Sequence, residues 1–193
     1  MDSLDAFYAK ALGCTVIHGS CIQVKGKNIL LVGKRLSGKT TLSQYLTLEK
    51  GGKFLHDDCI YVVDKTYVGF NMPLPVRSVR NSRCENYFIG QTIDFDGVTR
   101  YLYSPLSCVS EMQNVDFIVF PTYNTSGENR IDKLSNAYTF KVIINNIRQH
   151  GKMKIMFNDI NHLVTFSKSY KIKYTSSERA YDFLEMIISG ITY

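Results

Sequence analysis

The residues from Gly33 to Thr40 read Gly-Lys-Arg-Leu-Ser-Gly-Lys-Thr and match the phosphate-binding pattern G-x-x-x-x-G-K-[ST] at every fixed position. Glycines let backbone N–H groups close on phosphate oxygens, and the start of a helix adds free amides and a positive dipole end. Within this pattern Lys39 neutralises the β- and γ-phosphates, and the Thr40 hydroxyl binds Mg²⁺. The pattern therefore predicts that the chain binds ATP with Mg²⁺. The residues expected to contact the nucleotide are Gly33, Lys34, Arg35, Leu36, Ser37, Gly38, Lys39, Thr40 and Thr41.

Two adjacent carboxylates, Asp57 and Asp58, follow Lys39 at a distance of 18 and 19 residues. One helix and one short strand fit into that length, so the pair is expected to return to the phosphate loop. On an extended segment the two side chains point to opposite sides, and one can serve a metal or base site while the other supports it. A solvated turn is the alternative interpretation. Asp116 stands at the start of an apolar run, not at its end, which is the wrong place for a metal-binding acid.

The elements that must position these residues can be predicted from the pattern of apolar residues. Residues 16–28 suggest a hairpin, and residues 28–33 form four apolar residues and a glycine, as in a strand buried on both faces. Residues 40–50 have helical spacing, and Gly51-Gly52 supplies the stop. Residues 53–64 then indicate a short strand pair around the two aspartates, with Ile60, Val62 and Val63 in the core.

The second half of the chain predicts further strands and helices. Residues 70–103 are interrupted by Pro and Gly and are expected to form irregular strands and loops. A strand is predicted over Val115–Phe120, ended by Pro121, and a helix over Ser135–Gln149, with Ser135 as its N-cap. Two further strands are predicted near His162–Phe166 and Tyr170–Tyr174. The last prediction is a capped helix that follows Thr175-Ser176-Ser177-Glu178 and carries an apolar stripe of Ala180, Phe183, Leu184 and Ile187. The expected fold is α/β, with a P-loop mixed β-sheet core and flanking helices in one domain over residues 1–193.

Several segments, in this order, resemble the catalytic domain of HPr kinase/phosphorylase and its shorter bacterial relatives, which share a P-loop core with phosphoenolpyruvate carboxykinase. The matching segments are His18-Gly19 before a hairpin, the phosphate loop, Asp57-Asp58, Pro73-Leu74-Pro75-Val76-Arg77, Phe120-Pro121 and Leu134-Ser135. Only the loop and the Asp pair are specific. Leu36 stands where that family commonly has a glycine.

The resemblance implies an ATP-dependent kinase that transfers the γ-phosphoryl group to a hydroxyl. Asp57 would take the proton from a serine hydroxyl, Asp58 and Thr40 would hold Mg²⁺, and His18 would lie near the same pocket as a catalytic residue with Lys39 and Asp57. Arg77 is a candidate for clamping phosphate oxygens of the substrate. The acceptor stays open between a protein, a peptide and a small hydroxyl compound. An accessory protein that senses ATP without transferring phosphate is the alternative.

Composition limits the remaining possibilities. The chain has 193 residues, 45% hydrophobic and 21% charged, with a net charge of +6 that favours an anionic ligand. No dense Lys/Arg block indicates nucleic acid, and no window reaches the ~20 apolar residues of a membrane span. The N-terminus lacks a secretory pattern, so a cytoplasmic location is expected. Five irregularly spaced cysteines predict reduced thiols without a zinc site, and homo-oligomerisation stays open.

Overall fold

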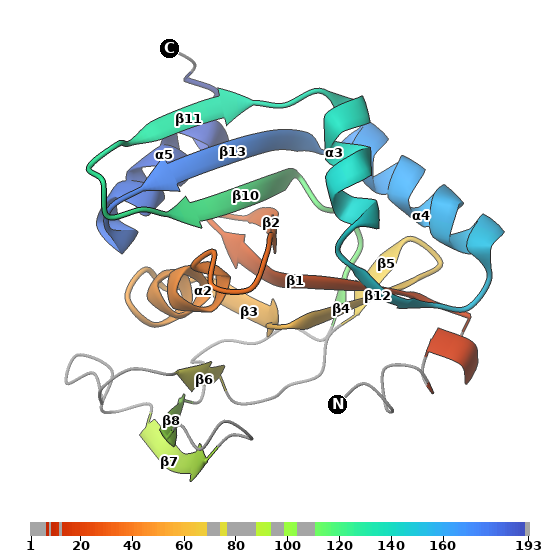
Figure 1. Cartoon of the computed structure of the whole chain (residues 1–193), viewed down its shortest axis with the longest axis horizontal. Coiled ribbons are helices and arrows are strands. Elements are labelled where there is room, and N and C mark those ends of the chain that lie inside the picture. Colours follow the sequence, from red (N-terminus) through yellow and green to blue (C-terminus); the bar gives the residue numbers. More distant parts are fainter. Residues whose placement is uncertain are drawn as a thin grey trace.

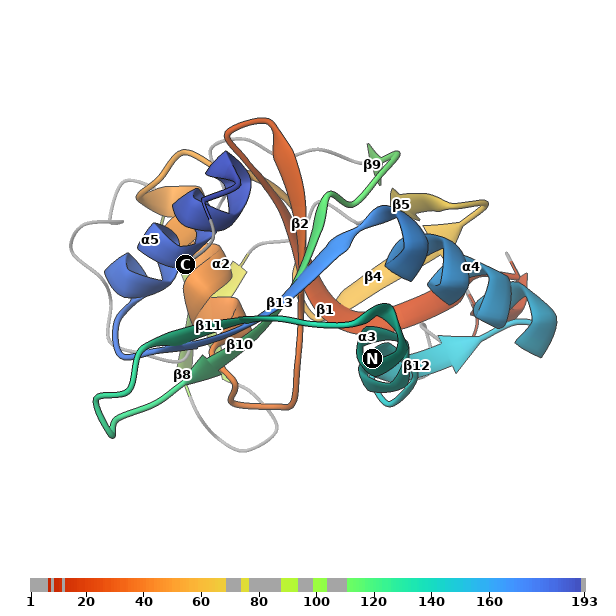
Figure 2. The same ribbon diagram turned by 90° about the horizontal axis from the view of Figure 1, so that it is seen from above.

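The computed structural model describes residues 7, 9–11, 13–68, 74–76, 88–93, 99–103 and 111–191. Within these residues the centre of the fold is a mixed sheet with helices on both faces (Figures 1 and 2). The strands run in the order β11 (Arg130–Lys133), β13 (Lys168–Tyr174), β10 (Phe117–Tyr123), β2 (Lys27–Val32), β1 (Thr15–Val24), β4 (Cys59–Val63), β5 (Thr66–Val68) and β9 (Glu111–Met112), and both β3 (Lys53–His56) and β12 (Ile147–His150) also pair with β1. The predicted α/β fold with a mixed sheet and flanking helices is confirmed.

Helices lie on both faces of this sheet. α2 (Lys39–Leu48) and α5 (Ser177–Ser189) lie on one face, and α3 (Asn136–Ile144) and α4 (Met153–Phe166) lie on the other (Figure 2). A separate small sheet of β6 (Leu74–Val76), β8 (Thr99–Tyr103) and β7 (Phe88–Ile93) follows β5 in the chain. None of the helices in the described part of the chain combines the length and the apolar character that a membrane crossing needs.

β2 is buried on both faces, as its four apolar residues predict. Ile29 and Leu31 contribute to the core beneath α2 and α5, whereas Leu30 and Val32 contribute to the core beneath α3 and α4. This division follows from the two-residue period of a strand. β2 lies between β1, which is antiparallel to it, and β10, which is parallel to it. The strand that leads into the phosphate loop is therefore held at the centre of the fold.

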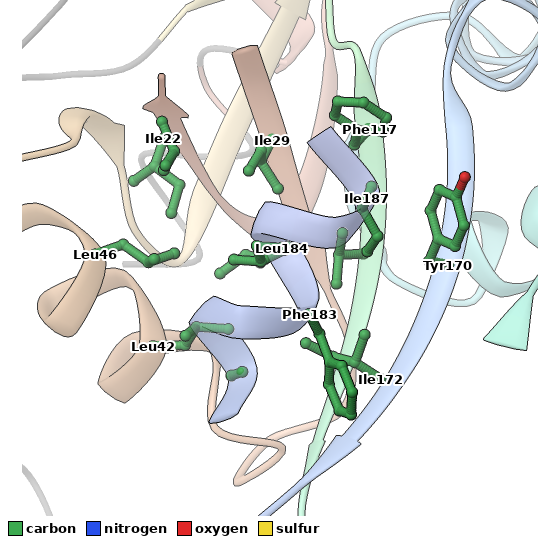
Figure 3. Packing of buried hydrophobic residues seen from close by; sticks show 14 of the residues in the cluster. Ile22, Ile29, Leu42, Leu46, Phe117, Tyr170, Ile172, Phe183, Leu184 and Ile187 are labelled. Atoms are coloured by element: carbon green, nitrogen blue, oxygen red, sulfur yellow. The ribbon is translucent and has the colours of Figure 1, made fainter. Parts of the chain in front are cut away.

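α5 covers the core that lies between the sheet and the pair of helices α2 and α5. Its N-cap is Ser176, whose Oγ accepts a hydrogen bond from Arg179 N at 3.2 Å. The predicted stripe of Ala180, Phe183, Leu184 and Ile187 is buried and packs against Leu42 and Leu46 of α2 and Ile172 of β13 (Figure 3). This packing fixes α2, and with it the start of the helix at Lys39.

β1 exchanges its neighbours at His18 and Gly19. Before this point it pairs with β4 and β12, and after it with β3 and β2. Gly19 is required here because a Cβ would lie 2.7 Å from Leu31 O of the adjacent strand. β3 and β4 pair with β1 and not with each other, so Asp57 and Asp58 stand in the gap between them. The place where β1 changes its pairing partners therefore lies next to the start of the phosphate loop, next to the Asp pair and next to one end of β12.

Three predicted elements differ from the structure. The helix predicted over Ser135–Gln149 has the expected cap, with Ser135 Oγ accepting from Tyr138 N, but it ends at Ile144. The Asn146 side chain donates to the Val142 carbonyl at 2.8 Å, and the following residues form β12. The prediction was wrong because long-range pairing with β1 outweighs a local helical preference there.

The second difference concerns His162–Phe166, which was predicted to be a strand and is the last part of α4. Met156, Ile160, Leu163 and Val164 of this helix form one buried face with helical spacing. The short segment His162–Phe166, with Leu163, Val164 and Phe166 as its apolar residues, could not distinguish a strand from a helix by itself. The predicted strand over Tyr170–Tyr174 is confirmed within β13.

The third difference is that β10 continues through Pro121 to Tyr123. Proline removes a donor, and it is tolerated here because β2 pairs with β10 only as far as Val119. Cys14, Cys21 and Cys59 are buried and are not in disulfides, as predicted for them. Arg77, Cys84 and Cys108 lie outside the described residues, as do most of residues 69–110, so the predictions for them remain predictions.

Candidate nucleotide site

The phosphate loop joins the end of β2 to the first turn of α2. Gly38 is the N-cap of α2 and has a φ of 95°, a left-handed conformation that favours glycine. Any larger residue at position 38 would also clash, since a Cβ there would lie 2.2 Å from the Tyr174 hydroxyl. Leu36 adopts a φ of 67° and is 79% exposed at the outer part of the loop. The loop thus has its backbone arranged around the helix N-terminus, as phosphate binding requires.

β10 and β13 hold the loop from one side. Tyr123 N donates to Ser37 O at 3.1 Å, and the Tyr174 hydroxyl donates to Gly38 O at 3.4 Å. The Tyr123 and Tyr174 rings contact each other edge to face, with their centroids 5.9 Å apart. These contacts attach the loop to the carboxyl ends of two parallel strands, where open α/β sheets commonly bind ligands.

Lys39 is 6% exposed, and its ammonium group lies within the loop. Nζ donates to Gly33 O at 2.7 Å and to Lys34 O at 3.0 Å. Burial lowers the pKa of Lys39, the charges of Asp57 and Asp58 oppose this change, and the nearby charge of Arg148 adds to it. A buried cation held by neutral carbonyl groups is well placed to exchange them for anionic phosphate oxygens.

Asp57 lies near Thr40 at the start of α2 and near Ser20 of β1, whose hydroxyls act to lower its pKa. Its Oδ1 atom is buried and has no hydrogen-bond partner among the described residues. Burial raises the pKa of Asp57; the contact with Thr40 opposes the rise and the charge of Asp58 increases it. Asp57 is therefore a better proton acceptor than an ordinary carboxylate.

Asp58 points in another direction, toward His18 and Arg148. Its Oδ1 accepts a hydrogen bond from Arg148 Nη2 at 2.8 Å and lies 3.2 Å from His18 Nδ1. Burial alone would raise the pKa of Asp58, but the His18 contact and the charge of Arg148 lower it to about 2. Asp58 has a φ of 81°, so the pair is not extended as the sequence suggested. The two carboxylates nevertheless face different partners.

The structure brings together His18, Lys39, Thr40 and the Asp pair, whereas Arg77 lies outside the described residues. Asp116 is at the opposite end of β10, where it accepts from Lys27 Nζ and Asn28 N, in keeping with its predicted unsuitability. The sequence reasoning missed Arg148, because it assigned this residue to a helix, and it missed Ser20. Tyr123 was also missed, although its position at the carboxyl end of a parallel strand was a usable signal.

The donors at this place suit a magnesium ion. The Thr40 hydroxyl and the Asp58 carboxylate, which stays ionised, are oxygen ligands of the kind that Mg²⁺ prefers. Beside Thr40, Asp57 Oδ1 is a buried acceptor without a partner in the described part of the chain. The residues present therefore fit a nucleotide-bound Mg²⁺.

Neither known family models nor curated protein sequences match this chain. Among solved structures, the Hpr(Ser) kinase/phosphatase from Coxiella burnetii is similar to it with a TM-score of 0.40 and 10% sequence identity, over 90% of this chain and 93% of that chain. The function proposed below rests on this chain's own residues.

Proposed function

We propose that the protein is an ATP-dependent phosphotransferase that phosphorylates a hydroxyl group, with a serine of a protein or peptide, or a small molecule, as the acceptor. The observation that carries the proposal is the environment of Asp57. This carboxylate adjoins Thr40 of the phosphate loop, has a buried Oδ1 without a hydrogen-bond partner in the described residues, and has a raised pKa. A site that only binds nucleotide needs a metal contact but no proton acceptor.

In the proposed reaction, Lys39 gives up its two loop carbonyls and neutralises charge on the β- and γ-phosphates. Asp57 accepts the acceptor hydroxyl's proton as its oxygen forms a bond to the γ-phosphorus, and the bond from that phosphorus to the β,γ-bridging oxygen breaks to release ADP. A bound Mg²⁺, held by Thr40 and Asp58, would supply charge neutralisation for the phosphates. His18 and Arg148 keep Asp58 oriented and ionised.

The alternative is an ATP-binding sensor without transfer. One observation favours it: Asp58, predicted to hold metal, has its Oδ1 already engaged by Arg148 and His18. Both functions predict ATP binding, so binding alone does not separate them.

The test compares Asp57→Asn with the unchanged protein. Calorimetry measures Mg²⁺–ATP affinity, and γ-labelled ATP incubated with lysate, or slow ATP hydrolysis, measures transfer. The variant is expected to bind ATP within a few-fold and to lose transfer by roughly 10²–10⁴, the usual contribution of a general base. Full turnover in the variant would remove Asp57 from the mechanism. Absence of any transfer by the unchanged protein, with ATP bound, would favour the sensor.

A further inference from the structure

Tyr123 is a large aromatic side chain that remains in contact with solvent beside the phosphate loop. It is the last residue of β10, and 53% of it is exposed. Its backbone N–H donates to Ser37 O at 3.1 Å, so its position is tied to the loop and not only to the sheet. An aromatic ring that is exposed at this place can stack on a flat ring such as a nucleobase.

The ring of Tyr123 is held in place by buried residues. It contacts the ring of Tyr174 edge to face, at a centroid distance of 5.9 Å and an interplanar angle of 64°. Tyr174 is only 2% exposed, and its hydroxyl donates to Gly38 O. Because Tyr174 fixes one side of the ring, little further conformational freedom is lost when a ligand contacts it.

We infer that Tyr123 is the stacking platform for the nucleobase of the bound nucleotide. This inference rests on the ATP binding in the proposed function. Triphosphate held by Lys39 and the loop amides places the nucleoside a short distance away, and Tyr123 presents an exposed ring at the same edge of the sheet. Base stacking tolerates any base, so Tyr123 distinguishes a nucleotide from bare polyphosphate and does not select adenine over guanine.

A purely structural role for Tyr123 makes a different prediction. Its Cβ lies 3.3 Å from the point where a Gly38 Cβ would stand, so the side chain also packs against the loop. If this packing were its whole role, removing the ring would disturb the loop and weaken every phosphate ligand equally. A stacking role weakens only ligands that carry a base. Inorganic tripolyphosphate is therefore the probe that separates the two.

Calorimetry should compare Tyr123→Ala and Tyr123→Phe with the unchanged protein for Mg²⁺–ATP and for tripolyphosphate. Loss of one stacked base is worth about 5- to 150-fold in affinity. Tyr123→Ala is expected to lose ATP affinity by such a factor and to keep tripolyphosphate affinity within about twofold, whereas Tyr123→Phe stays near the unchanged protein. An equal loss for both ligands, or no loss for ATP, would overturn the stacking role. Binding of neither ligand by the unchanged protein would overturn the proposed function and this inference together. If the unchanged protein binds ATP but transfers no phosphate, the proposed kinase activity is overturned and the stacking role of Tyr123 is not.

A second measurement uses the absence of tryptophan from the sequence. Tyr123→Trp makes the only tryptophan of the chain a reporter at the proposed platform, and Phe166→Trp places one at a 71% exposed position on α4 as the matched control. ATP is expected to change the emission of Trp at 123 and tripolyphosphate to leave it unchanged, while the control responds to neither. Equal responses of position 123 to the two ligands would contradict stacking.

Discussion

Arg148 of β12 donates from Nη2 to Asp58 Oδ1 at 2.8 Å, across 90 residues of sequence. The same guanidinium donates from Nη1 to Cys59 Sγ at 3.2 Å. β12 reaches this position because β1 pairs with it just before the exchange point at His18, where Asp58 also lies. The ion pair therefore joins two segments that are far apart in the sequence, and it holds Asp58, the carboxylate predicted to bind Mg²⁺.

A double-mutant cycle of Arg148→Ala with Asp58→Asn should measure this pair. The Asp58 side chain is 41% exposed, so solvent screening limits the expected coupling to about 0.5–1 kcal/mol in the free energy of unfolding. Denaturant unfolding gives the four values. The Arg130 and Asp132 pair is the control, because its arginine is 61% exposed and the cycle there should give a smaller coupling. A zero coupling between Arg148 and Asp58 would show that their contact contributes nothing to stability.

Lys39→Ala is expected to weaken Mg²⁺–ATP binding by roughly 10- to 150-fold, the usual value of a hydrogen bond to a charged group, and to abolish transfer. The reason is that the buried ammonium group can no longer meet the phosphates. Calorimetry measures the affinity. Lys53→Ala, which removes an exposed lysine at the start of β3, should bind ATP normally. If Lys39→Ala keeps its ATP affinity, the loop does not bind phosphate in the predicted way.

The two aspartates should affect stability in opposite directions at neutral pH. Burial raises the folded-state pKa of Asp57, so its ionised form costs stability, and Asp57→Asn should raise the melting temperature at pH 7. This gain should shrink as pH falls through the raised pKa, because the wild-type carboxyl is then neutral as well.

Asp58 has the opposite sign, because its partners lower its folded-state pKa from 3.8 to about 2. Its contribution is present above pH 3.8 and is lost as pH falls toward 2, so Asp58→Asn should lower the melting temperature at pH 7. Thermal melts of both variants at pH 4, 5.5 and 7 give the comparison. A decrease for both variants at pH 7 would contradict the assignment of Asp57.

The rate of phosphate transfer should depend on pH through the ionisation of Asp57. A general base must be ionised, so the acid limb of the turnover profile should have its midpoint above the usual carboxyl value of 3.8. Any residual turnover of Asp57→Asn should lack this limb. A limb that persists unchanged in the variant would belong to another group.

Leu184→Ala should destabilise the fold by about 2–5 kcal/mol, because Leu184 of α5 is fully buried against α2 and the sheet (Figure 3). Denaturant unfolding measures the loss. Ile191→Ala, at a 59% exposed position just after α5, is the control and should change stability by less than about 0.5 kcal/mol. A similar effect of both substitutions would contradict the packing of α5 against the sheet.

Several local features could be predicted because they depend on neighbouring residues in the chain. The buried strand before Gly33, the helix after Gly38, the Ser135 and Ser176 caps and the stripe of α5 all follow from short-range patterns. Two-residue and 3.6-residue periods, glycine conformations and capping side chains operate within about one or two turns of chain.

The sequence by itself thus determined the phosphate loop, its flanking strand and helix, and the proximity of an Asp pair to that loop. Only the tertiary structure decided that β1 changes partners at His18, that residues 147–150 form a strand instead of a helix, and that Arg148 and Tyr123 join the site. The pairing of β1 with β12 and the hydrogen bond from Tyr123 N to Ser37 O each join segments more than 80 residues apart in the sequence. The free energy of such contacts comes from burial and long-range hydrogen bonds, and these cannot be predicted from a local pattern of residues.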